Sequence, residues 1–410
     1  MAEQRSFVIV GASLAGAKAA ETLRAEGFDG RVVLVGEESF LPYERPPLSK
    51  DFLRGESPRE KAYVHPEGFY AEQGIELILS RRATALDISA AEVVLEDGER
   101  IRYDSLLLAT GSQVRRLTVP GAERRGVHYL RTLPDSEALG KAIRGGGRVA
   151  VIGAGWIGCE VAASARQMGA EVVMIDLASL PLERVLGTEM GSFYRQVHVE
   201  HGVELRLGVG VAALLGGESV EAVELADGSR VEADMVVAGV GVTPRVELAE
   251  QAGLALDNGV VTDAQLTTSV LGVFAAGDVA NAWHPVLGRR VRLEHWSSAL
   301  NHGPVAARNM LGQAVSYTKL PYFYSDQYDV GMEYSGLAAA GDEVVVRGSL
   351  AERRFIAFWV KDGRVTAGMN VNIWDVAGDI AQLVEAAVPV DRGRLADPDV
   401  PLSELLPAGI

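Results

Sequence analysis

The chain has 410 residues, of which 48% are hydrophobic and 23% charged, a balance typical of an ordinary globular protein that is too long for one core. Its formal net charge of −16 argues against a general nucleic-acid binder, because neutralising phosphates requires a basic surface. No signal-peptide pattern precedes Phe7 and no apolar run is long enough to span a membrane, so we expect a cytoplasmic protein without a membrane anchor.

The first predicted element is a strand that leads into closely spaced glycines. In FVIVGASLAG, a β-branched run precedes a turn with Gly11, Ser13 and Gly16, and an Ala-rich helical stretch follows. This context is typical of a dinucleotide-binding fingerprint, in which glycines let the backbone approach a pyrophosphate at a helix N-terminus. Ser13 occupies the position where this fingerprint usually has its middle glycine. The next strand-like run ends at Glu37, whose carboxylate is expected to bind ribose hydroxyls.

A complete copy of the fingerprint recurs in VAVIGAGWIG, with Gly153, Gly155 and Gly158, and the following apolar run ends at Asp176. Two copies, each with its acidic residue, predict two dinucleotide cofactors and two Rossmann-like domains. We expect Asp176 to accept both ribose hydroxyls of NADH and to repel the 2′-phosphate of NADPH, because no arginine follows within the next few residues.

The repeat extends beyond the two fingerprints. DGERIRYDSLLLATG, from Asp97 to Gly111, resembles DGSRVEADMVVAGVG, from Asp227 to Gly241. Each Asp-Gly predicts a hairpin turn between short strands, and each apolar run predicts a strand that returns to the cofactor edge. The sequence therefore predicts an α/β fold with a duplicated architecture.

In the last third of the chain, an apolar run that ends in a small-residue turn occurs once more, and after Tyr322 the pattern changes. Asp278 follows the apolar run VFAAG, which places its carboxylate at the end of a predicted strand, although an acidic residue there also suits a helix N-cap. After Tyr322, VVVRGS and RFIAFWV predict strands, KDGRV a hairpin and WDVAGDIAQLVEAA a helix. These elements predict an α+β domain. The proline-punctuated tail from Leu395 to Ile410 is expected to be irregular.

Cysteine and histidine usage narrows the chemistry. Cys159 is the only cysteine, so no disulfide forms within the chain, which disfavours disulfide reductases and thiol peroxidases. A helix N-terminus can lower a thiol pKa, but a small buried core residue is the better interpretation of Cys159. The seven histidines are scattered, no pair has metal-ligand spacing, and we expect no metal site.

Together the motifs resemble the NADH-dependent, FAD-containing ferredoxin reductases that serve oxygenases. The resemblance spans nearly the whole chain, and its markers are GASLAG, YERPPLSK, LLLATGS, GAGWIGCE, GVTPR, VFAAGDVA, EHW and PYFYSDQYD. Members of the family usually carry tryptophan where Tyr324 stands. The chain resembles the family of apoptosis-inducing factor more distantly.

The resemblance implies three domains and two sets of cofactor-binding residues. The FAD-binding domain comprises residues 1–112 and 246–321, the NAD-binding domain residues 113–245 and the C-terminal α+β domain residues 322–410. The residues implied at FAD are Gly11, Ser13, Gly16, Glu37, Arg45, Lys50, Ala83, Ala109, Thr110, Gly111, Asp278 and Trp296. Those implied at NADH are Gly153, Gly155, Trp156, Ile157, Gly158, Asp176 and Gly241.

Few catalytic side chains are implied, because hydride transfer between NADH and FAD depends mainly on positioning. In the family, a lysine of the RPPLSK stretch pairs with the glutamate of the second fingerprint helix near the flavin N5. This implies Lys50 and Glu160 as the catalytic pair. Without the resemblance, a solvated lysine and a glutamate favoured at a helix start are equally good interpretations.

We therefore expect an NADH:ferredoxin oxidoreductase, in which FAD takes a hydride and passes single electrons to a small iron–sulfur ferredoxin that feeds an oxygenase. Two alternatives stay open: a signalling flavoprotein that resembles apoptosis-inducing factor, and a direct NADH reductase of a small molecule such as a quinone. Such ferredoxins are generally acidic, so docking requires local basic side chains, for which the candidates are Arg289, Arg290, Arg292 and Arg308. The oligomeric state is left open.

Overall fold

The computed structural model describes residues 4–406, which divide into two compact units. The first unit contains the chain up to Glu44, Arg59–Gln113 and Thr243–Pro321. The second unit contains Arg45–Pro58, Val114–Val242 and the chain from Tyr322 onward. The division into three domains that the resemblance implies stays a prediction. Among the described residues, no helix combines the length and apolar character needed to cross a bilayer.

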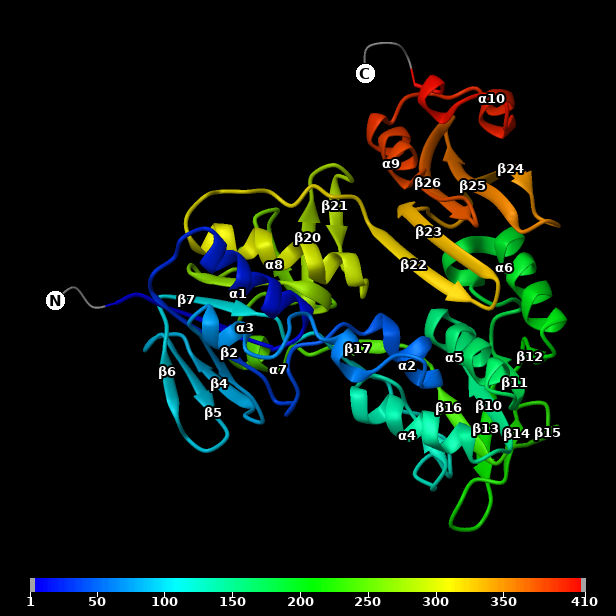
Figure 1. Cartoon of the computed structure of the whole chain (residues 1–410), viewed down its shortest axis with the longest axis horizontal. Helices are drawn as coiled ribbons and strands as arrows, with labels where there is room; N and C mark the ends of the chain where they lie inside the picture. Colours follow the sequence, from blue (N-terminus) through cyan, green and yellow to red (C-terminus); the bar gives the residue numbers. More distant parts are fainter. Residues whose placement is uncertain (1–3, 407–410) are drawn as a thin grey trace. The chain divides into compact units, whose positions relative to one another are not determined.

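The first unit is built on a five-stranded parallel sheet in the order β19-β7-β1-β2-β3. Its strands are β1 (Ser6–Val10), β2 (Arg31–Val35), β3 (Ile75–Ile78), β7 (Ser105–Leu108) and β19 (Val273–Ala275). Helices α1 (Leu14–Ala25) and α8 (Trp296–Met310) lie side by side against it (Figure 1). A β-carbon at Gly303 would lie 2.4 Å from the Ala15 carbonyl oxygen, so only glycine lets the two helices pack this closely.

Side chains of β1 alternate between two cores, as expected for a strand buried on both faces. Phe7 and Ile9 belong to the core with α1 and α8, whereas Val8 and Val10 contact the core on the other face. That second core includes the antiparallel sheet of β4 (Ala83–Asp87), β5 (Glu92–Leu95) and β6 (Arg100–Arg102), and α7 (Glu247–Gln251). The remaining elements are η2 (Arg59–Ala62), α3 (Phe69–Glu72), β18 (Val260–Thr262), η3 (Gly277–Val279), β20 (Ala280–His284) and β21 (Arg289–Val291).

The second unit repeats this plan with a parallel sheet in the order β12-β11-β10-β16-β9. Its strands are β9 (Val127–His128), β10 (Arg148–Ile152), β11 (Glu171–Asp176), β12 (Glu204–Leu207) and β16 (Met235–Ala238). Its helices are η1 (Pro46–Ser49), α2 (Asp51–Arg54), α4 (Leu133–Arg144), α5 (Trp156–Gln167) and α6 (Glu183–Glu200). The antiparallel sheet of β13 (Val211–Leu215), β14 (Ala222–Leu225) and β15 (Arg230–Glu232) matches β4, β5 and β6 of the first unit. β8 (Ser112–Val114) pairs with β17 (Val242–Pro244).

The C-terminal segment forms an antiparallel sheet in the order β22-β23-β26-β25-β24 (Figure 1). Its strands are β22 (Tyr322–Gln327), β23 (Val330–Gly336), β24 (Glu343–Ser349), β25 (Arg354–Lys361) and β26 (Arg364–Val371). Helix α9 (Ala377–Ala386) packs on β26, and Gly368 is required there because a β-carbon would lie 2.5 Å from Ile380. The α+β prediction for this segment is therefore confirmed.

Both Asp-Gly hairpins and both parallel sheets that the repeat predicts are present, which confirms the α/β prediction. The described part of the tail from Leu395 is mostly irregular, as expected, apart from the end of α10 (Arg392–Ala396) and the 3-10 turn η4 (Leu402–Glu404). The Asp391 carboxylate caps α10 by accepting from the Arg394 N–H, a local signal that the prolines obscured. Residues 407–410 of the predicted tail lie outside the described residues.

Candidate cofactor-binding site

The first fingerprint turn leaves no room for side chains at two of its positions. Gly11 has a φ of 121°, and a β-carbon there would lie 2.0 Å from the Ala109 carbonyl oxygen. A β-carbon at Gly16 would lie 2.0 Å from the Gly11 carbonyl oxygen. Ser13 is the N-cap residue of α1, but its side chain makes no capping hydrogen bond. The Ser13 side chain therefore leaves the N–H groups of the first turn of α1 uncapped. A pyrophosphate site requires such N–H groups as donors.

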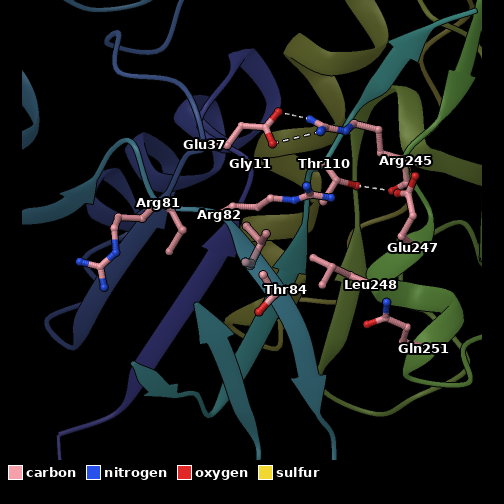
Figure 2. A pocket seen from close by; sticks show the side chains of 13 residues that line it. Gly11, Glu37, Arg81, Arg82, Thr84, Thr110, Arg245, Glu247, Leu248 and Gln251 are labelled. Atoms are coloured by element: carbon pink, nitrogen blue, oxygen red, sulfur yellow. Dashed lines mark hydrogen bonds and ion pairs between the residues drawn. The ribbon is translucent and has the colours of Figure 1, made fainter. Parts of the chain in front are cut away.

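A cavity of about 330 Å³ lies at the end of this turn (Figure 2). It brings together Gly11, Glu37, Ala83 and Thr110, four of the residues implied at FAD. Arg245 is among the lining residues that sequence analysis missed, although it closes the GVTPR marker. Its guanidinium pairs with both oxygens of Glu37, with the Nη2–Oε2 distance at 3.0 Å, while its carbonyl oxygen accepts from the Thr110 hydroxyl at 2.7 Å.

The Glu37 carboxylate is thus held in one orientation at the cavity wall, since a bidentate arginine fixes both of its oxygens. Ala109 is buried and Gly111 has a φ of 68°, with its carbonyl oxygen accepting from the Arg245 N–H at 2.9 Å. An arrangement of glycine turn, fixed carboxylate and adjoining cavity fits the adenosine diphosphate half of a dinucleotide.

Asp278 and Trp296 lie on two separate elements of the first unit, η3 and α8. Asp278 is in the turn η3, where the Gly277 N–H donates to His302 Nδ1 at 3.3 Å. Trp296 is the first residue of α8, and burial raises the pKa of the nearby Glu44 carboxylate despite the opposing effect of the indole. Neither Asp278 nor Trp296 lines the cavity of Figure 2, so their proposed contact with the cofactor stays a prediction.

The second fingerprint turn has the same geometry. Gly153 has a φ of 106° and a β-carbon there would lie 2.3 Å from the Gly239 carbonyl oxygen, while one at Gly158 would lie 1.9 Å from the Gly153 carbonyl oxygen. Gly155, the N-cap residue of α5, is exposed, and a β-carbon there would meet no atom within 4 Å. The open side of this turn faces solvent, where a phosphate group has room to approach the backbone.

Asp176 is held at the end of β11 by two backbone hydrogen bonds. One carboxylate oxygen accepts from the Ala154 N–H at 2.6 Å and the other from the Ala178 N–H at 2.7 Å. These bonds fix the carboxylate beside the glycine turn and leave further lone pairs on both oxygens. The geometry fits the ribose-binding acid of an NAD site.

Three other residues implied at NADH also belong to the second unit. Ile157 is 45% exposed, and Gly241 has a φ of 96°. The Trp156 ring contacts Tyr194 and Phe323 edge-on, at centroid distances of 6.1 and 4.9 Å. The contribution of these three residues to NADH binding stays a prediction.

Lys50 and Glu160 form a buried ion pair with an Nζ–Oε2 distance of 2.8 Å. Glu160 is 4% exposed and also accepts from the hydroxyls of Ser49 and Ser325, which sequence analysis missed. The Lys50 ammonium lies 5.6 Å from the centre of the Tyr324 ring, within the range of a cation–π interaction. The residues are thus brought together in the second unit, and their role at a flavin stays a prediction.

Arg45 and three of the four candidate docking arginines contact other groups of the protein. Arg45 belongs to the second unit, where it donates to the Arg131 carbonyl oxygen at 3.0 Å. Of the candidate docking arginines, Arg290 donates to the Thr262 carbonyl oxygen, Arg292 pairs with Glu294 at 2.6 Å and Arg308 with Glu26 at 2.8 Å. These contacts hold three of the four arginine side chains within the protein, Arg289 and Arg290 are both exposed, and the docking role of all four stays a prediction.

Cys159 is fully buried in α5, with its sulfur 3.5 Å from the Ala154 carbonyl oxygen. Burial raises the pKa of this thiol well above its usual value, which keeps it protonated and unreactive. Within the described part of the chain, no group of three histidine, cysteine or acidic side chains is arranged to hold a metal ion.

Replacing Cys159 by serine is expected to leave steady-state turnover within about twofold of the parent, because a protonated, buried thiol contributes packing rather than chemistry. Steady-state kinetics of the purified variant check this. Loss of flavin reduction while the flavin stays bound would contradict it.

Two family profiles match the chain. The pyridine nucleotide-disulphide oxidoreductase family matches residues 5–303, and the reductase C-terminal family matches residues 322–406. The chain belongs to the pyridine nucleotide-disulphide oxidoreductases. As a member of this family it is an oxidoreductase with a flavin and NAD(H) as cofactors, and the two glycine turns described above fit that pair of nucleotides.

Relatives of this oxidoreductase cover almost its whole length. It is 42% identical over 401 residues to the ferredoxin–NAD(+) reductase component of the anthranilate 1,2-dioxygenase system of Burkholderia cepacia, with 98% of this chain and 99% of the relative covered. It is 37% identical to putidaredoxin reductase of Pseudomonas putida, with 98% and 97% covered. The solved covalent putidaredoxin reductase–putidaredoxin complex matches with a TM-score of 0.94 and 37% identity, covering 98% of each chain. The predicted resemblance to the ferredoxin reductases of oxygenase systems is confirmed.

Proposed function

We propose that this oxidoreductase oxidises NADH and, through FAD, reduces a small iron–sulfur ferredoxin that supplies an oxygenase. The observation that carries this proposal is the pair of glycine turns without room for side chains, each at the end of a parallel sheet and each beside an oriented carboxylate, Glu37 or Asp176. The acceptor class rests on the relatives, whose names are those of ferredoxin reductases.

The first turn is proposed to bind FAD. Gly11, Gly16 and the first turn of α1 would hold the pyrophosphate, Glu37 the adenosine ribose, and Ala83 the base, because all of them adjoin the cavity or its turn. The proposed FAD-binding domain is that of residues 1–112 and 246–321. When bound, a flavin supplies the conversion between a two-electron donor and a one-electron acceptor.

The second turn is proposed to bind NADH in a domain of residues 113–245. Gly153, Gly155 and Gly158 would approach the pyrophosphate, and Asp176 the adenosine ribose. Lys50 and Glu160 are proposed as the charged pair that serves the hydride step, since they form a buried ion pair that neither glycine turn requires for its conformation. We also propose a cytoplasmic location.

A stopped-flow experiment tests the function. The purified protein is mixed with NADH while flavin absorbance is followed, and the reduced protein is then mixed with a panel of ferredoxins and with a quinone. Rapid bleaching followed by transfer to at least one ferredoxin supports the proposal. Slow bleaching points to a signalling flavoprotein, and transfer to the quinone alone points to a small-molecule reductase.

NADH is expected to be preferred to NADPH by about 100-fold or more in kcat/KM, because placing a 2′-phosphate beside a carboxylate costs several kcal/mol. Asp176 is fixed by its two backbone bonds and cannot turn away. Measuring both kcat/KM values checks this, with Asp176→Asn as the matched variant that should narrow the preference. Equal values for the two nucleotides would remove Asp176 from the ribose site.

A further inference from the structure

A row of polar side chains runs through the second unit from a surface turn to Glu160. Its buried members are His198 on α6, Ser325 and Gln327 on β22, and Glu160 on α5. His198, Ser325 and Gln327 are each no more than 1% exposed. Burying polar groups is unfavourable unless each finds a hydrogen-bond partner, so the partners of these side chains show what the row does.

Each hydrogen bond in the row points toward Glu160. The Gln327 amide donates to Ser325 Oγ at 3.2 Å, and Ser325 donates to Glu160 Oε1 at 2.7 Å. The Gln327 amide oxygen lies 3.1 Å from His198 Nε2, and since that oxygen only accepts, Nε2 carries the proton. Burial lowers the pKa of His198 to about 4, so the ring is neutral, and Nδ1 accepts from the Tyr328 hydroxyl at 3.2 Å.

The outer end of the row is held by an unusual turn. Tyr328 has a φ of 58°, a conformation that side chains with a β-carbon rarely adopt and that stores local strain. Its ring stacks on His201 at a centroid distance of 3.8 Å and an angle of 9°. In this strained conformation the Tyr328 hydroxyl reaches Nδ1 of His198.

The inner end of the row completes the surroundings of one carboxylate. Glu160 Oε1 accepts from Ser325, while Oε2 accepts from Ser49 and pairs with Lys50 at 2.8 Å. With donors on both oxygens, the carboxylate cannot rotate away from Lys50. Replacing a buried ion pair by apolar side chains of similar size is often neutral or stabilising, so stability alone does not account for the buried pair at the end of the row.

The row does not serve as a proton relay. A hydroxyl or an imidazole accepts one proton and releases another, but the Gln327 amide in the middle of the row would have to protonate or tautomerise. The hydrogen bonds instead have a single direction, and together they fix the orientation of the carboxylate at the end of the row.

We propose that Ser325, Gln327 and His198 are positioning residues that hold the Glu160 carboxylate against Lys50. The proposal rests on the proposed function, in which that pair serves the hydride step. It assigns to the C-terminal segment a part in hydride transfer, because β22 supplies two members of the row. These residues act through Glu160 and need not contact either cofactor.

The first test compares Ser325→Ala with Ser325→Thr in the flavin-loaded protein, with Ser335→Ala as the control. Ser335 is buried on β23, beside β22, and lies outside the row. Stopped-flow measurements separate the limiting rate of flavin reduction from the Kd of NADH. Ser325→Ala should lower the limiting rate about 10-fold, as expected for losing one hydrogen bond to a charged group, with the Kd unchanged. Threonine should restore the rate to within about twofold, and Ser335→Ala should leave it unchanged.

A second readout needs neither NADH nor a ferredoxin. The Tm losses of Ser325→Ala and Glu160→Leu should be less than additive in the double variant, because both remove the same hydrogen bond. Additive losses, a threonine variant as slow as the alanine variant, or an equal slowing in Ser335→Ala would overturn the proposal. If the parent failed to reduce ferredoxin, the proposed function would fall while this thermal cycle still decided whether the row acts on Glu160.

Discussion

Replacing Glu160 by leucine is expected to lower the free energy of unfolding by about 3–5 kcal/mol. Lys50 is 9% exposed, so the substitution leaves a buried ammonium without its counter-ion and removes the acceptor of two serine hydroxyls. Urea unfolding at neutral pH measures the loss. In the same variant, NADH should reduce the bound flavin very slowly if the pair serves the hydride step.

Removing both charges should recover most of the lost stability, because the cost of Glu160→Leu arises from the unpaired Lys50 rather than from lost attraction. The double variant Lys50→Met with Glu160→Leu is therefore expected within about 2 kcal/mol of the parent. The exposed pair of Arg31 and Glu76 is the control, since Glu76→Leu should cost less than about 1 kcal/mol. A double variant as unstable as Glu160→Leu alone would contradict this account.

The protein is expected to lose stability steeply as the pH falls from 6.5 to 4. Burial lowers the pKa of His198, His295 and His302 to about 4, whereas each has a pKa of about 6.5 in the unfolded chain. Between these values the unfolded chain takes up protons that the folded protein does not, so the stability present above pH 6.5 is lost as the pH falls. Each histidine contributes up to about 3 kcal/mol to the loss by pH 4.

Thermal unfolding at several pH values in this range measures the effect. Two carboxylates act in the opposite direction, since desolvation raises the pKa of Glu44 and of Asp326, but they are outnumbered by the histidines. His198→Gln should flatten the pH dependence by removing one of the three titrating groups. A Tm that stays constant from pH 6.5 to 4.5 would show that these imidazoles can be protonated where they lie.

Much of the fold could be predicted because its signals are local. The runs around Phe7 and Val149 combine β-branched residues with glycines at fixed spacing, and both form buried parallel strands that lead into glycine turns. The Asp-Gly pairs at Asp97 and Asp227 form the hairpins that turn chemistry requires. The short helix at Arg392 was missed because a five-residue element depends on one capping bond rather than on a repeating pattern.

The candidate site was predicted where a motif places a residue and missed where distant segments meet. The bond between Ser325 and Glu160 joins positions 165 residues apart, and that between Glu37 and Arg245 joins positions 208 apart. Neither serine nor arginine carries a local signal for such a partner. Ser325 and Gln327 are two residues apart on β22, so both side chains lie on its buried face. Polar side chains are explained there only by their hydrogen-bond partners on other elements of the unit.

The strand order of the two parallel sheets also affects the sequence of events during translation. β9, β10, β11, β12 and β16 all lie between Val114 and Val242, so that sheet can close once this stretch has left the ribosome. The sheet that begins with β1 cannot, because β7 keeps an open edge until β19 is synthesised at Val273. The N-terminal strands therefore emerge first but complete their sheet only after the sheet of β10, and until β19 is made they keep an aggregation-prone edge open.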